Sequence, residues 1–467
     1  MARLSIRSAL VATAILIATT GATEPVRVSL DDAPAAINKL LSANQPSAAR
    51  EIAMAALRVR PNDQVLQLML AKVEIAGGRA AKGIDIASAV YASARHDRIA
   101  FLAARIRAEG HVRLEQYTRA QLWLRLASGY AETPRETASL ARDYKQIKRV
   151  NPWSTSLRFG VTPSNNVNNG SSGSTFAFGQ YLFDLGLEGI DPSIVTELSE
   201  DEKQLSGLQF SVGADFQYRL SQSKTTATYV TGSLDYRTFA LSDEAKEIAP
   251  DAQGSDYENG SVVVGLVRRQ IIDGNAEPLS LRANFGQVWF DGAPYSQFVE
   301  GSFSQNYAID EQNQIGLNGY LNDQTILETG VKSRTRGVRL SWGHKFANDD
   351  RLRVVLHAKQ SASPRIDSTF NSQQIDVNYT FAEPIAGLKL SAGFEIGQTR
   401  HPQSRFTAGL GARSSVNYGV EGSAQFTQFD LYGFQPVVTV KGSITESTVD
   451  LFDRENLSLG FDFRSSF

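Results

Sequence analysis

The chain of 467 residues contains no cysteine. Disulfide bridges and thiolate zinc sites are therefore excluded, even for a protein exported to an oxidising compartment. An excess of one charge is also lacking: 47 basic residues face 49 acidic ones, and the net charge of −2 gives no reason to expect a nucleic-acid partner. Beyond the N-terminal segment, no apolar run approaches the roughly 18 residues that a transmembrane helix needs. A membrane location would therefore require a β-barrel.

Residues typical of catalytic or metal sites are few. The five histidines are scattered, and none has a second histidine or a carboxylate at metal-ligand spacing on one helix face. We expect His344 on the polar side of a strand and His401 in a loop. No nucleophile-elbow or phosphate-loop motif is visible. We therefore expect no enzyme activity, no metal and no cofactor, with a serine–histidine pair across a barrel lumen as the remaining alternative.

The first 22 residues have the pattern of a secretory signal peptide. Arg3 and Arg7 precede an apolar run from Ala9 to Ala18, which is followed by small residues up to Ala22. The apolar run is too short to span a bilayer, which favours a cleaved signal over a membrane anchor. The length of the chain predicts at least two further domains.

Residues 31–150 predict an all-α, periplasmic domain. The segment is rich in Ala, Leu and Arg, its apolar residues recur at helical spacing, and breaks such as Gly110 divide it into about seven helices. Asn62 and His96 begin matching breaks 34 residues apart, which is the period of tetratricopeptide repeats with two helices per unit. A generic helical bundle remains the alternative. Either arrangement offers a groove for peptides or proteins.

Residues 151–467 predict an antiparallel β-barrel, because polar and apolar residues alternate with a period of two. The clearest strand runs from Leu208 to Leu220. We count about 14 strands, an even number as bacterial outer-membrane barrels require. The apolar face would contact lipid, with Tyr and Trp residues in interfacial girdles. The polar face would line the lumen and carries several charges, namely Arg219, Arg282, Arg339, Lys345 and Asp462.

The connections between the expected strands favour a membrane barrel over a soluble β-sandwich. Alternate connections are long and short, as expected for surface loops and periplasmic turns. One connection, Asp291–Pro294, is short where a long one is expected.

Two segments are candidate functional sites. The last strand, Glu455–Phe467, alternates apolar and polar residues and ends on an aromatic one, and it resembles the closing strand of outer-membrane barrels. On that resemblance, an assembly signal for the barrel-assembly machinery is expected, formed by Phe461, Phe463 and Phe467. The second segment, 164–173, is rich in Asn, Gly and Ser, which favour turns. It is interpreted as a flexible loop or, alternatively, as a client-contact loop with the residues Asn165, Asn166 and Asn168.

Together these features resemble the surface lipoprotein assembly modifiers, the Slam family. The likeness is most specific in the barrel, at the entry from Asn151-Pro152-Trp153 to Asn168 and at the exit, Tyr432–Pro436 and Phe452–Phe467. The resemblance implies an outer-membrane protein that moves a client, either a surface lipoprotein or a secreted haem- or metal-capturing protein. The helical domain would bind the client and the barrel would pass it.

Two other functions remain open. Polysaccharide exporters also join tetratricopeptide repeats to an outer-membrane barrel, but a polymer path should carry a belt of one charge sign, whereas basic and acidic residues are mixed on the polar faces here. A passive porin would have no use for a client-binding domain.

Overall fold

The computed structural model describes residues 29–176, 191, 195–272, 277–365, 368–404, 411–429 and 434–465. They form two compact units, Met1–Leu114 and Glu115–Phe467. The expected signal peptide and Phe467 lie outside the described residues. Among the described helices, none is both long and apolar enough to cross a membrane.

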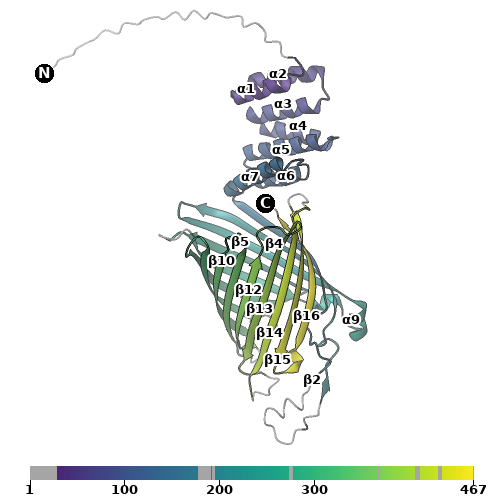
Figure 1. The fold of residues 1–467 in the computed structure, drawn as a ribbon, viewed down its shortest axis with the longest axis vertical. Coiled ribbons are helices and arrows are strands. Elements are labelled where there is room, and N and C mark those ends of the chain that lie inside the picture. Colours follow the sequence, from purple (N-terminus) through teal and green to yellow (C-terminus); the bar gives the residue numbers. More distant parts are fainter. Residues whose placement is uncertain are drawn as a thin grey trace, which may run out of the picture. The chain divides into compact units, whose positions relative to one another are not determined.

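The first unit is a stack of antiparallel helices (Figure 1). Its helices are α1 (Ala33–Ser42), α2 (Pro46–Val59), α3 (Gln64–Ala76), α4 (Ala80–Ala92) and α5 (Asp97–Arg113). Asp63 caps α3 by accepting the backbone N–H groups of Val65 and Leu66. Buried alanines between the helices, including Ala49, Ala53, Ala71 and Ala103, allow close packing around larger apolar side chains.

The break expected at Gly110 is wrong, because α5 continues to Arg113. A Cβ atom at Gly110 would lie 2.5 Å from the Ile84 side chain of α4. This glycine therefore serves close helix packing. The turn falls instead at Glu115, which has a positive φ of 57°.

The second unit begins with α6 (Tyr117–Ser128) and α7 (Pro134–Val150), so the described part of 31–150 contains the seven helices that the sequence predicts. A closed antiparallel barrel of fourteen strands follows, confirming the expected fold class (Figure 1). The strands of the barrel are β1 (Trp153–Ser164), β4 (Gly207–Gln222), β5 (Thr226–Leu241), β6 (Asn259–Gln270), β7 (Leu279–Phe290), β8 (Ala293–Ala308), β9 (Asn313–Ile326), β10 (Lys332–Lys345), β11 (Arg351–Ala362), β12 (Phe370–Thr380), β13 (Leu388–His401), β14 (Arg413–Phe426), β15 (Phe434–Ser447) and β16 (Arg454–Ser465).

The two ends of the barrel differ. We call the end where β1 begins the near end and the opposite end the far end. The three longest connections, β1 to β4, β5 to β6 and β13 to β14, are all at the far end. The first carries the short strands β2 (Thr175–Phe176) and β3 (Thr196–Glu197), and the second carries the helix α9 (Asp243–Ile248). The shortest far-end connection joins β7 and β8, where Asp291 and Gly292 have φ values of 48° and 66°. Two consecutive left-handed residues make the tight turn that suits the twist of a two-residue hairpin.

The exterior of the barrel is apolar, as the alternation predicts. Leu, Val, Ile and Phe side chains of neighbouring strands point outward and are exposed in the isolated protein. Near the near end, rings of Trp342, His344, Phe346 and Tyr379 lie next to one another, with successive centroid distances of 5.8, 4.7 and 5.8 Å. An apolar band with an aromatic girdle, an even strand number and unequal ends define a transmembrane barrel of the outer-membrane type.

Two expectations for histidines are wrong. His344 shares the outward face of β10 with Trp342, because both alternate with the inward Lys345, and it belongs to the aromatic girdle. His401 is the last residue of β13 and is buried.

Candidate functional site: the lumen and the seam between the first and last strands

The lumen is lined by the polar residues of the fourteen strands. The register places Arg339, His357, Gln374 and Gly397 in one inward row across β10 to β13. The expected lumen residues Arg219, Arg282, Arg339, Lys345 and Asp462 all have the inward parity of their strands.

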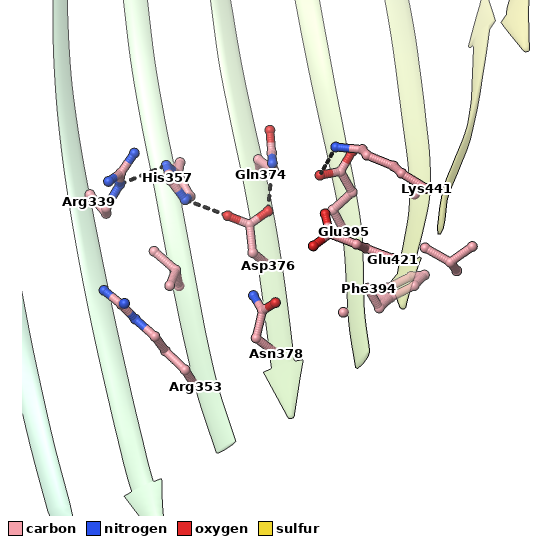
Figure 2. A pocket seen from close by; sticks show the side chains of 14 residues that line it. Arg339, Arg353, His357, Gln374, Asp376, Asn378, Phe394, Glu395, Glu421 and Lys441 are labelled. Atoms are coloured by element: carbon pink, nitrogen blue, oxygen red, sulfur yellow. Dashed lines mark hydrogen bonds and ion pairs between the residues drawn. The ribbon is translucent and has the colours of Figure 1, made fainter. Parts of the chain in front are cut away.

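One cluster of lumen side chains forms a pocket with a volume of about 310 Å³ (Figure 2). His357 lies between Arg339, whose Nε donates to His357 Nδ1 at 3.2 Å, and Asp376, whose Oδ2 lies 2.6 Å from His357 Nε2. Because Nδ1 accepts a hydrogen bond, the imidazole proton is assigned to Nε2. Gln374 donates to the other Asp376 oxygen at 2.6 Å. The cluster fixes a histidine–carboxylate pair in a defined orientation.

The pocket is suited to holding polar groups rather than to nucleophilic catalysis. Serine, threonine and cysteine are absent from the described residues that line it. Arg353 lies on one side of the pocket, and the acidic Glu395 and Glu421 lie on the other (Figure 2). Lys441 Nζ lies 3.6 Å from Glu395. The lumen wall therefore carries both charge signs side by side.

A second charged network joins the first strands. Arg158 of β1 forms ion pairs with Asp215 of β4 and, at 2.8 Å, with Asp235 of β5. All three side chains face the lumen. The network ties β1 firmly to β4 and β5.

The other edge of β1 is held far less extensively. β1 pairs with β4 along its whole length, from Trp153 to Ser164, whereas its ladder with β16 contains only Gly160–Asp462, Val161–Phe461 and Ser164–Ser458. Across the described part of β16, the near-end half of β1 has no ladder partner. Among the described residues, the seam between the first and last strands is thus the shortest ladder of the barrel.

The Asn-rich segment closes the far end of this seam. The backbone N–H of Asn165 donates to Leu457 O at 3.2 Å, and its Oδ1 accepts the Leu457 N–H at 2.7 Å. Farther along, Ser172 N–H donates to Asp453 O at 2.9 Å. These bonds connect the segment to the beginning of β16 and extend the short ladder.

The same segment is also bound to the chain that precedes β4. Asn166 is buried, and its amide exchanges hydrogen bonds of 2.8 and 3.0 Å with the backbone of Gly170. Asn168 Nδ2 donates to Lys203 O at 2.7 Å, and its Oδ1 accepts from Leu205 N–H at 2.9 Å. The amides of the segment thus bind its own backbone and the chain before β4.

Two of the three expected assembly residues, Phe461 and Phe463, lie on the outer face of β16. Phe461 and Phe463 point outward and are 46% and 52% exposed. Phe461 lies directly at the seam, opposite Val161.

Two helices are fastened at the near mouth of the barrel. Inside the second unit, Arg219 of β4 donates to the carbonyl oxygens of Arg149 and Val150 at 3.0 and 2.8 Å. These carbonyls end α7, where a positive charge is favourable. The Arg125 guanidinium of α6 lies 4.7 Å from the centroid of the Phe434 ring. These contacts join the helix pair to strands β4 and β15 of the barrel.

Sequence alternation alone assigns His357 and Asp376 to inward faces, but their contact depends on the register between β11 and β12. Likewise, the role of Asn165 depends on a partner almost three hundred residues away. The Asn-rich composition was the available signal, and it did not reveal these partners.

Comparisons with known proteins add little. No family model matches the chain, and no curated protein matches its sequence. The barrel is similar to a loop-deletion mutant of OmpT, an outer membrane protein of Vibrio cholerae, with 9% identity over 67% of this chain and 99% of that chain and a TM-score of 0.31. It is also similar to a bacterial polysaccharide outer membrane secretin (8% identity, 67% and 98% coverage, TM-score 0.32) and to OpdK of Pseudomonas aeruginosa (8%, 67% and 98%, 0.34). Similarities this distant carry no argument about function.

Proposed function

We propose that this protein is an outer-membrane translocator that delivers a client polypeptide, a surface lipoprotein or a secreted haem- or metal-capturing protein, to the cell surface. The helical units bind the client in the periplasm, and the barrel passes it outward. The near end of the barrel faces the periplasm, since short turns mark that side in outer-membrane barrels. The resemblance to the Slam family at both ends of the barrel supports this proposal.

The short seam between β1 and β16 is the observation that carries the proposal. A β-strand edge without a partner presents unpaired N–H and C=O groups, to which an extended polypeptide can add as a further strand. Among the described residues, that edge is the near-end half of β1, which begins directly after α7. A client released by the helices therefore meets the barrel at its least paired edge.

The far end of the seam must also yield for a polypeptide to pass. There the hydrogen bonds of Asn165 to Leu457 and of Ser172 to Asp453 hold the two strands together. In this proposal the client displaces the segment that contains Asn165, Asn166 and Asn168 and so opens the seam. In the same scheme, Phe461, Phe463 and Phe467 are read by the barrel-assembly machinery before the client arrives.

The seam can be locked without disturbing the rest of the protein. A Cβ atom at Gly460 would lie 3.7 Å from Thr162 Oγ1 on β1 and 3.8 Å from Thr439 Cβ on β15. The Cβ–Cβ distance between positions 460 and 439 matches that of disulfides, about 3.8 Å. On β1, Thr162 Oγ1 occupies the position that a cysteine sulfur would take, and the natural chain has no cysteine that could interfere. The double variant Gly460→Cys with Thr162→Cys locks the seam, whereas Gly460→Cys with Thr439→Cys is a matched control on the other side of the same strand.

The assay co-expresses each variant with a candidate client encoded next to this protein and measures client exposure by protease treatment of intact cells. We expect exposure with the natural chain and with the control, its loss with the seam lock, and its recovery on adding a reductant. Exposure that is unaffected by the seam lock would refute passage at the seam. A client that is never exposed, together with loss of a secreted polymer on deletion, would replace this function with polysaccharide export.

A further inference from the structure

The run of outward apolar residues is much shorter on β12 than on β4. On β4 the outward apolar residues run from Leu208 to Leu220, whereas on β12 they run only from Ile375 to Tyr379. At about 3.3 Å per residue, these runs cover about 40 Å and about 13 Å of strand. Outward positions above Ile375 carry the polar side chains of Asn371 and Gln373. On β12, polar side chains therefore lie closer to the middle of the membrane than on β4.

Two adjacent outward rows across these strands form the descending polar surface. The upper row, called here the head row, places Arg336, Gln360, Asn371 and Arg400 side by side on β10 to β13. Arg336 Nε donates to Gln360 Oε1 at 2.9 Å. Among the residues that the structure describes, Arg336 has no carboxylate partner. Arg334, one outward position higher, is instead paired with both oxygens of Asp323.

The lower row, called here the recess row, is hollowed. It places Gly319, Val338, Ala358, Gln373 and Gln398 side by side on β9 to β13. Ala358 supplies little volume where other outward positions carry Leu, Ile or Phe, whereas the Phe303 ring covers Gly319. The resulting grooves have volumes of about 940 and 560 Å³ and share Val338, Ala358 and Gln373.

We propose that this surface, on the outer face of β9 to β13, binds a phosphorylated, acylated lipid of the outer leaflet. The head row binds the phosphate through Arg336, with Arg400 and the amides of Gln360 and Asn371 as further donors. The recess row accommodates part of an acyl chain. The head row lies toward the far end, which is the side of the outer leaflet, because long connections face outward in such barrels.

Charge favours a phosphorylated lipid over a neutral one. A guanidinium at the edge of the hydrocarbon is costly unless an anion or a dipole stabilises it. Arginine and phosphate form strong, directional hydrogen bonds. Gln360 satisfies only part of the Arg336 guanidinium, since a single oxygen accepts both of its bonds. A phosphate at the head row would provide the missing anion, and a locally thinner bilayer without a bound lipid is the competing explanation.

The test measures lipid adducts of the full-length protein in detergent by native mass spectrometry, with diphosphoryl lipid A, phosphatidylglycerol and a neutral diacylglycerol as probes. Arg336→Gln removes the charge of the head row, and Arg334→Gln on the same face of β10 is its control. Ala358→Leu fills the recess, and Ala392→Leu, an outward alanine of β13 that does not line either groove, is its control.

We expect a phosphorylated probe to bind more tightly than the neutral lipid. Arg336→Gln should weaken its binding roughly tenfold, a loss typical of a charge-assisted hydrogen bond. Ala358→Leu should also weaken its binding, because leucine fills the recess. The lipid affinity of the two control variants should remain within about twofold of that of the natural chain. Stronger binding of lipid A than of phosphatidylglycerol would identify the surface glycolipid as the ligand, and the reverse order a phospholipid. Equal binding of charged and neutral lipids, or equal effects of Arg336→Gln and Arg334→Gln, would overturn the proposal in favour of a thinner bilayer.

Discussion

Replacing Glu74 by glutamine should strongly destabilise the first helical unit. The Glu74 side chain, on α3, is completely buried. Its carboxylate lies 2.9 Å from Arg50 Nε of α2, forms an ion pair with Arg79 before α4, and lies 3.8 Å from Lys82 Nζ of α4. One side chain thus holds three consecutive helices. Glutamine has nearly the same shape, so the substitution tests the charge and not the packing.

The contacts give the expected size of the effect. Two hydrogen bonds to charged groups are lost or weakened, each contributing about 1.5 kcal/mol at the lower end of their range. We use the lower end because the Arg50 and Arg79 side chains are 37% and 49% exposed and water partly screens them. The free energy of unfolding should therefore fall by about 2–3 kcal/mol. For a domain of this size, the melting temperature should fall by roughly 10 to 20 °C.

Circular dichroism at about 222 nm on the full-length protein in detergent reports this transition, since helices dominate the signal at that wavelength. Glu51→Gln, an exposed position on α2, is the control and should leave the melting temperature within about 2 °C. A fall of less than about 3 °C in Glu74→Gln, or an equal fall in the control, would refute the central role of this carboxylate.

The stabilising effect of Glu74 should depend on pH, which a comparison of the natural chain with Glu74→Gln can measure. Burial alone raises the pKa of Glu74, but hydrogen bonds and attraction from Arg50 and Arg79 outweigh it, so the pKa lies below its ordinary value. A carboxyl with a lowered pKa stabilises the fold at pH values above the pKa of the unfolded chain, and this stabilisation is lost as the pH falls through the lowered pKa. The difference in melting temperature between the natural chain and Glu74→Gln should therefore shrink on acidification. A constant difference would contradict this assignment.

Two further substitutions test close packing and the Asn-rich segment. Gly83→Ala should lower the melting temperature of the helical unit, although alanine favours helix by about 1 kcal/mol, because its Cβ would lie 2.5 Å from the Ile75 side chain; the melting curve at 222 nm gives the sign. Asn166→Ala removes two hydrogen bonds to the Gly170 backbone and should cost about 1–3 kcal/mol locally. Limited digestion of the purified protein with proteinase K should then cut the 164–173 segment faster, and an unchanged cleavage rate would show that the amide does not hold it.

The strand number and the direction of the side chains could be predicted from sequence because both follow from local alternation. A strand places successive residues on opposite faces, so Leu208 to Leu220 already defined the outer face of β4 before any partner was known. Helix packing was harder to predict from the sequence. Gly110 was read as a break because glycine weakens helices, whereas its actual role depends on Ile84 in the preceding helix.

The candidate site was the least predictable part, because its contacts join positions far apart in the sequence. His357 and Asp376 meet only because β11 and β12 pair in one particular register, and a shift by one residue would turn every side chain to the opposite face. Asn165 binds Leu457 only because the barrel closes. Its composition marks the Asn-rich segment as unusual. Composition alone, however, does not distinguish a segment whose amides bind distant backbone from a mobile loop.

The seam and the head row offer different kinds of polar groups. This difference separates the two proposals. The near-end half of β1 has a strand edge, whose N–H and C=O groups suit another polypeptide. The head row has side-chain donors around Arg336, which suit an anion. The seam lies at β1 and β16, and the head row lies on β10 to β13, several strands away in the barrel order. Locking the seam should therefore leave lipid binding unchanged, and Arg336→Gln should leave the seam pairing unchanged. Loss of both properties in either variant would indicate a general defect of the barrel instead of two separate sites.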